Sequence, residues 1–133
     1  MSGDSELIYL DLEDILEFYA AIIGGTVAQA GDHLRDRSAL AGALSRPATH
    51  AHYGGADLIL QAAVLAHGIA ESQLFVDGNK RVALVAMLTF LEINGRTVTA
   101  SEHELADWIL SLSRGASPEE LADRVRLSVD RAN

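Results

Sequence analysis

The sequence predicts a single all-α domain over residues 1–133, a compact bundle of about six helices around a central antiparallel pair. Three observations predict this class. Apolar residues make up 49% of the chain, which is enough for a substantial core. Most apolar runs follow helical spacing and are separated by residues that start or stop helices. Two stretches, 58–70 and 82–93, are apolar on nearly every side, which is typical of buried helices.

The first predicted helix follows Asp11, whose carboxylate can cap the N–H groups of a first helical turn. Apolar residues then recur at helical spacing until Gly24 and Gly25 end the run. Residues 7–10, before the cap, are a short apolar stretch that could form a small edge strand.

The second predicted helix begins at Asp36. It is expected to stop at Pro47, because proline lacks the backbone N–H that continues a helix. Residues 49–55 are then expected to form a loop that carries His50 and His52 and ends in a glycine turn.

The two most apolar helices are predicted over residues 56–72 and 82–94. Only a short loop joins them, so they should pack as the central antiparallel pair. This arrangement places the loop at one end of the core, held from both sides.

Two more helices are predicted near the end of the chain. Ser101 and Glu104 have the spacing of a capping box, and Gly115 ends the helix that they begin. Ser117 is the predicted N-cap of the last helix, with Pro118 at its first position.

Charge and composition limit the classes of function. The formal net charge of -9 repels nucleic acid and anionic membranes, so general binding to either is not expected. The absence of cysteine excludes thiolate metal sites and thiol nucleophiles. No stretch is long and apolar enough to span a membrane, and the acidic start is unlike a secretory signal, which predicts a cytoplasmic protein.

The loop between the two buried helices holds the candidate functional site. It ends at the start of a helix, where unpaired backbone N–H groups attract anions. Gly78 lets a ligand approach the backbone closely, and Asn79 can donate from its side chain. Lys80 adds positive charge, and Arg81 can hold a phosphate through two parallel hydrogen bonds.

Two further residues of the loop define its chemistry. Asp77 is a hard oxygen ligand that could hold a magnesium ion bridging phosphates. Gln73 stands where such a loop would most need a base, and its amide cannot accept a proton near neutral pH. The alternative interpretation is a common polar turn over residues 77–79, followed by two solvated cations. The position between two buried helices strengthens the case for a binding site, and on these residues alone both interpretations stay open.

Residues 75–81, Phe-Val-Asp-Gly-Asn-Lys-Arg, resemble the core motif of the Fic/Doc superfamily in the form typical of Doc (death-on-curing) proteins. Segments at 9–14, 34–47, 66–71 and 88–95 also look like Doc, so the resemblance covers most of the chain. It implies a compact helical fold and transfer of part of a nucleoside triphosphate to a protein hydroxyl.

Lys80 and Leu84 stand where Fic relatives that transfer nucleotidyl groups carry glycine and a further arginine. The resemblance therefore implies the Doc-type reaction, phosphoryl transfer from ATP to a Ser or Thr hydroxyl of a translation elongation factor. Asp77 would hold magnesium or assist the base, Lys80 would take part in catalysis, and residues 78–81 would stabilise charge on the phosphates. Nucleotidyl transfer is the less favoured alternative.

Gln73 and Leu74 depart from the family motif, which begins His-Pro-Phe. The missing histidine is the residue expected to take the proton of the attacking hydroxyl, and loss of a positioned base typically costs about 10²–10⁴-fold in rate. Gln73 could still orient the hydroxyl by a hydrogen bond. Two interpretations follow: a phosphotransferase with weakened activity, or a pseudoenzyme that binds nucleotide or a protein partner.

Other histidines are weaker candidates for this base. His67 lies on the preceding helix, about 120° from the face of the motif's first position, and is expected to make core or interhelical contacts. His50 and His52 could reach the site if their predicted loop covers it, as a flap does in the family. His33 and His103 are expected to be peripheral.

The resemblance also implies a partner. Many Fic proteins restrain themselves with a helix bearing Ser/Thr-x-x-x-Glu-Gly/Asn, and this motif is not found in the sequence. Doc-type toxins are restrained instead by a separate antitoxin whose disordered tail folds on the toxin, so an antitoxin partner is expected. The acidic charge of the chain would suit basic residues on that partner.

Overall fold

The computed structural model describes residues 6–129, in which seven helices and no β-strand occur. The expected all-α class and the central antiparallel pair are confirmed, with one helix more than expected. The helices are α1 (Leu12–Ile23), α2 (Val27–His33), α3 (Arg37–Gly54), α4 (Leu58–Glu71), α5 (Asn79–Ile93), α6 (Glu102–Ser113) and α7 (Pro118–Arg126).

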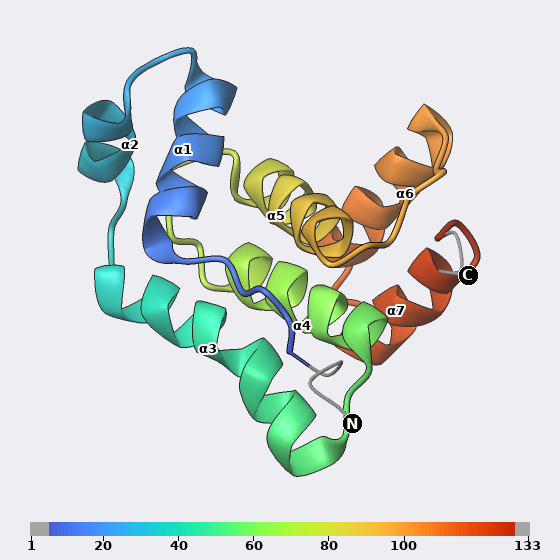
Figure 1. Cartoon of the computed structure of the whole chain (residues 1–133). Coiled ribbons are helices and arrows are strands. Elements are labelled where there is room, and N and C mark those ends of the chain that lie inside the picture. The colour runs from blue at the N-terminus through green and yellow to red at the C-terminus, as the bar shows by residue number, and fades with distance from the viewer. Residues whose placement is uncertain (1–5, 130–133) are drawn as a thin grey trace.

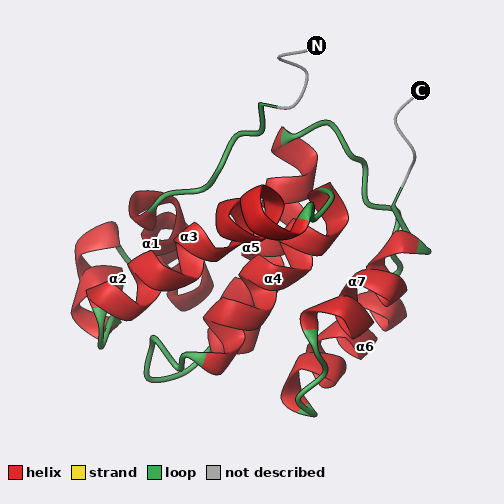
Figure 2. Cartoon of the chain, turned by 90° about the horizontal axis from the view of Figure 1, so that it is seen from below, coloured by secondary structure: helices red, strands yellow, loops and turns green. Residues whose placement is uncertain are grey.

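Helices α4 and α5 lie at the centre of the bundle and run antiparallel (Figure 1). Helices α3 and α7 pack on α4, whereas α1 and α6 pack on α5. Figure 2 shows α1–α3 on one side of the central pair and α6 with α7 on the other. The core includes the fully buried side chains of Ile15, Leu40, Leu65, Ile69, Met87, Phe90 and Leu121. Each such side chain stabilises the fold by about 1.5–3 kcal/mol.

Side chains cap the N-termini of six of the seven described helices. Such a cap accepts a hydrogen bond from the first turn and satisfies a donor that the helix leaves unpaired. The remaining helix, α5, begins at Gly78 and has no side-chain cap. The capping residues of the others are Asp11, Thr26, Asp36, Asp57, Ser101 and Ser117.

The predicted stop at Pro47 and the loop over residues 49–55 are wrong. Helix α3 continues through Pro47 to Gly54, so His50 and His52 lie on a helix. Pro47 is buried, and burial of its ring offsets part of the cost of about 3 kcal/mol for a proline inside a helix. The helix ends at Gly55, whose φ of 65° is the left-handed conformation typical of a C-cap.

Helix α2 is the additional helix. Its start carries a capping box, in which Thr26 accepts from the N–H of Gln29 and the Gln29 side chain accepts from the N–H of Thr26. This Thr-x-x-Gln pattern is visible in the sequence, but the short helix behind it has one buried residue, Ala30, and therefore no apolar stripe to signal it.

The edge strand considered for residues 7–10 does not form. The backbone of Ile8 pairs with the side chain of Asn94, which accepts from the Ile8 N–H at 2.8 Å and donates to its carbonyl at 2.9 Å. This segment is therefore fixed by the end of α5 and not by a strand partner. Among the described helices, none has the length and apolar character needed to cross a membrane.

Candidate functional site

The loop between α4 and α5 is anchored in the core by two fully buried side chains, Leu74 and Phe75. The Phe75 ring stacks on the ring of Tyr19 from α1, with centroids 3.8 Å apart and planes at 7°. The Leu74 carbonyl accepts a hydrogen bond of 2.8 Å from the N–H of Arg35, in the segment between α2 and α3. Contacts from distant parts of the chain thus fix the loop in one conformation.

Two polar contacts fix the rest of the loop. The Asn79 side chain accepts from the Phe75 N–H at 2.9 Å and donates to the Phe75 carbonyl at 2.8 Å. The Tyr19 hydroxyl donates to the Asp77 carbonyl at 2.9 Å. Burial raises the pKa of Tyr19, and the nearby charge of Asp77 raises it further, so this hydroxyl keeps its proton.

The start of α5 is open to a ligand. Gly78 has a φ of 79°, a left-handed conformation that glycine adopts without strain, and it provides no side-chain cap. The N–H groups of residues 79–81 therefore have no side-chain acceptor from the cap position. Such an N-terminus carries partial positive charge and is suited to binding an anion.

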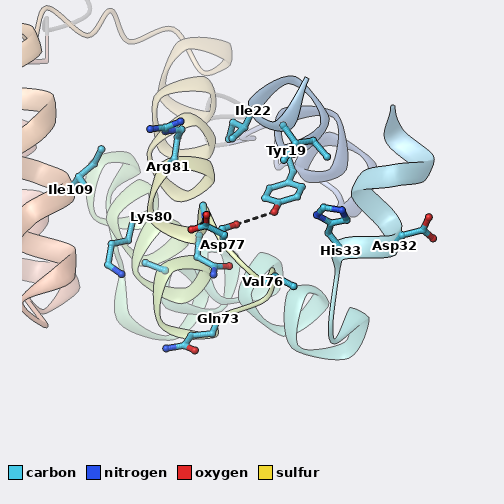
Figure 3. A pocket seen from close by; sticks show the side chains of 14 residues that line it. Tyr19, Ile22, Asp32, His33, Gln73, Val76, Asp77, Lys80, Arg81 and Ile109 are labelled. Carbon is cyan, nitrogen blue, oxygen red and sulfur yellow. Dashed lines mark hydrogen bonds between the residues drawn. The ribbon is translucent and has the colours of Figure 1, made fainter. Parts of the chain in front are cut away.

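A cavity of about 880 Å³ lies over this N-terminus. All six residues singled out from the sequence line it (Figure 3). Lys80 and Arg81 are exposed, and neither forms an ion pair with another residue in the range 6–129. The cavity therefore presents two cations without an ion-pair partner, beside the carboxylates of Asp32 and Asp77, within a chain that is acidic overall. The six residues are Gln73, Asp77, Gly78, Asn79, Lys80 and Arg81.

The structure gives Asn79 a function that its sequence position did not reveal. Both ends of its amide bind the backbone of Phe75, so the side chain holds the loop closed. Contact with a phosphate by the second hydrogen of this amide, or by the backbone N–H, stays a prediction.

Asp77 lies at the cavity with an exposed carboxylate. One of its oxygens accepts from the Gly78 N–H at 2.8 Å. No three His, Cys, Asp or Glu side chains gather at a potential metal site within the described residues. Magnesium is commonly held by one or two carboxylates together with substrate phosphates and water. Asp77 thus fits as a single protein ligand of a phosphate-bound magnesium ion.

Gln73 lies at the edge of the cavity in a strained backbone conformation. Its φ of 46° is the only positive value of a non-glycine residue within residues 6–129. This conformation costs a residue with a side chain on the order of 1–3 kcal/mol, and such residues cluster at functional sites. Histidine, asparagine and aspartate adopt it more readily than most residues.

Several cavity residues were not identified from the sequence. Tyr19 falls within the apolar run that follows Asp11, which predicts only core packing for it, and His33 is predicted to be peripheral. The structure brings both to the cavity, because α1 and α2 pack over the loop. No local signal marks them, since each is far from the motif along the chain. The others are Ile22, Ile23, Asp32, Ala70, Val76 and Ile109.

Three of the histidines considered as substitute bases do not line the cavity, namely His67, His52 and His50. His67 contacts Glu71, one turn further along α4, at 3.4 Å. His52 packs edge-on against Tyr53 near the end of α3. His50 is exposed on the same helix.

The helical fold and the motif loop at one end of its central helix pair agree with the comparison to known proteins. The sequence model of the Fic/DOC family matches residues 9–91, so the chain belongs to that family. The matched range runs from before α1 to near the end of α5 and contains the whole loop. Among curated proteins, the chain is 38% identical over 96 residues to "Toxin Doc" of Mycolicibacterium smegmatis, which covers 69% of this chain and 68% of the relative.

Proposed function

We propose that this protein is the toxin of a toxin–antitoxin pair and transfers the γ-phosphate of ATP to a Ser or Thr hydroxyl of a translation elongation factor in the cytoplasm. The curated relative named Toxin Doc supports the toxin class. The observation that carries the reaction is the uncapped start of α5, which opens into a cavity with two cations that have no ion-pair partner among residues 6–129.

The site has the hydrogen-bond donors and cations that phosphoryl transfer needs. The transition state spreads negative charge over phosphate oxygens, and fixed donors stabilise it without reorganising. The backbone N–H groups of α5 and the side chains of Lys80 and Arg81 supply these donors. Because the cavity volume falls within the usual range for small-molecule sites, a nucleoside triphosphate is a suitable occupant.

Magnesium would be held by Asp77 together with the phosphates, and it would neutralise part of their charge. The protein's own contribution is to keep the Asp77 backbone in place. Tyr19 does this through its hydrogen bond to the Asp77 carbonyl.

Gln73 supports a second candidate function, that of a pseudoenzyme which binds nucleotide or a protein partner. Glutamine can orient a hydroxyl but cannot take its proton. Nucleotidyl transfer is a third and weaker candidate. Lys80 is the residue type that Doc proteins carry at its position, and Leu84 replaces the further arginine of nucleotidyl-transferring relatives.

The test compares the native chain with Gln73→His, using α-labelled and γ-labelled ATP, magnesium and a bacterial lysate. Histidine is among the residues that tolerate the φ of 46° at this position, so the substitution should preserve the loop. We expect γ-label on one protein, with Gln73→His the faster chain; about 10²–10⁴-fold is the full effect of gaining a positioned base where no other group takes the proton.

Asp77→Asn in the Gln73→His background is the matched control and should lose most of the transfer. Transfer of the α-label would establish nucleotidyl transfer in place of phosphoryl transfer. Nucleotide binding by calorimetry, with no transfer of either label by either chain, would leave the pseudoenzyme as the function.

The proposed antitoxin partner has its own readout. Expression of the chain should arrest bacterial growth, and co-expression of the antitoxin should relieve the arrest. Relief by Asp77→Asn as well would attribute the arrest to the site and not to general toxicity of the folded protein.

A further inference from the structure

We infer that His33 serves as the proton acceptor that position 73 lacks. This inference rests on the proposed function, since it needs an attacking hydroxyl. Of the five histidines in the chain, all lie within the described residues, and His33 alone lines the cavity. Imidazole is the side chain best suited to take a proton near neutral pH.

The position of His33 is fixed by the motif loop itself. The next residue, Leu34, forms an isolated antiparallel bridge with Phe75. The one after it, Arg35, donates its N–H to the Leu74 carbonyl at 2.8 Å. The Arg35 hydrogen bond belongs to this bridge, so the segment that carries His33 is tied to the backbone of the loop immediately after His33.

The side chain is also oriented. The His33 ring meets the Tyr19 ring edge-on, with centroids 5.9 Å apart and planes at 61°. Tyr19 in turn binds the Asp77 carbonyl at 2.9 Å. In Figure 3, His33 and Tyr19 lie on one side of Asp77, and Lys80 and Arg81 lie on the other. A hydroxyl that entered between them would meet the phosphate site on one side and the imidazole on the other.

His33 is free to act. It is exposed to the cavity and forms no hydrogen bond or ion pair with a residue in the described part of the chain. In the step that we infer, the Ser or Thr oxygen forms a bond to the γ-phosphorus while the bond from that phosphorus to the β–γ bridging oxygen breaks. ADP leaves with that electron pair, and the hydroxyl proton passes to a ring nitrogen of His33 and then to solvent.

The test measures γ-phosphate transfer and ATP affinity for the native chain, His33→Gln and His50→Gln. His50→Gln is the matched control, because it makes the same change at an exposed histidine outside the cavity. We expect His33→Gln to lower the transfer rate by about 10²-fold, the low end for a positioned base, with ATP affinity unchanged. His50→Gln should change neither quantity.

A second pair of variants separates chemistry from folding. His33→Ala should regain transfer when free imidazole is added, and a merely structural side chain would not be replaced in this way. In Gln73→His, which has its own base, adding His33→Gln should cost less than threefold.

Every other outcome contradicts either this inference or the proposed function. Full transfer by His33→Gln, or an equal fall in affinity and rate, would overturn the inference and leave the proposed function standing. So would an inactive native chain beside an active Gln73→His chain. Absence of transfer from both of these chains would overturn the proposed function, and the assignment of His33 with it.

Discussion

Helices α4 and α5 are neighbours in the core, yet their N-termini are built in opposite ways. At the start of α4, Asp57 accepts from the Leu60 N–H at 2.9 Å and also binds Arg126 at 2.5 Å. At the start of α5, Gly78 provides no cap, and the nearby Arg81 has no carboxylate partner among the described residues. One terminus is closed by its own chain, and the other is open to the cavity.

The difference shows that the backbone N–H groups at the start of α4 contribute to stability, whereas those at the start of α5 are left for a ligand. A capped N-terminus satisfies its donors internally and gains about 1 kcal/mol from the cap. An open one leaves the same donors for a ligand and loses that contribution. Phe75, Leu74 and Tyr19 anchor the loop rigidly. The N-terminus of α5 can therefore remain ordered although no side chain caps it.

The largest expected effect comes from removing the anchor of the open terminus. Phe75→Ala should lower the free energy of unfolding by about 3–5 kcal/mol, because it removes a fully buried ring and its stack with Tyr19. Chemical denaturation measures the loss. Val76→Ala, at the exposed neighbouring residue, should change stability by less than about 0.5 kcal/mol. Similar losses for both variants would mean that the ring does not anchor the loop.

The second prediction contrasts the two arginines. Arg81→Ala should weaken ATP binding by about 10- to 100-fold, the effect of losing a hydrogen bond between charged groups, with little change in stability. Arg126→Ala should leave ATP binding unchanged and lower stability by less than about 1 kcal/mol, since its partner is an exposed carboxylate. Calorimetry and thermal unfolding of both variants test the contrast. Equal ATP affinities would contradict the assignment of the open terminus as the phosphate site.

The smallest expected effect concerns the pH dependence of the closed terminus. The hydrogen bond from Arg126 lowers the pKa of Asp57 below its ordinary value of 3.8. A carboxylate with a lowered folded-state pKa stabilises the protein above its unfolded pKa, and this contribution is lost as the pH falls through the folded pKa.

Asp57→Asn tests this directly, because asparagine keeps the cap and removes the charge. The native chain should be more stable than the variant by less than about 1 kcal/mol at pH 7, because the side chains of Arg126 and Asp57 are 40% and 55% exposed. Below about pH 4 the difference should shrink. If the difference in unfolding free energy stays constant from pH 7 to pH 3, the ion pair with Arg126 does not stabilise the fold through the charge of Asp57.

Local patterns in the sequence predicted most helix starts correctly. Asp11, Asp36, Ser101 and Ser117 are all caps in the structure, as expected. Capping depends on residues within one turn, so it can be recognised without the rest of the fold.

The errors in the helix predictions have a different origin. Pro47 is accommodated in α3 because its ring is buried, which depends on a neighbouring helix. Helix α2 lacks a broad apolar face, so periodicity did not reveal it. At Pro47 tertiary packing overrides the local preference against a helix, and at α2 tertiary packing stabilises a helix that has little local signal.

The sequence by itself determined that residues 75–81 form the motif and that two central helices flank it. Spacing, caps and apolar runs act over a few residues, so they can be recognised locally. Only the tertiary structure decided what faces that motif. Tyr19 reaches Asp77 across 58 positions of the chain, and His33 is brought to the cavity by a bridge between its neighbour Leu34 and Phe75. These contacts depend on how α1 and α2 pack over the loop, and that packing has no signature in any short stretch of sequence.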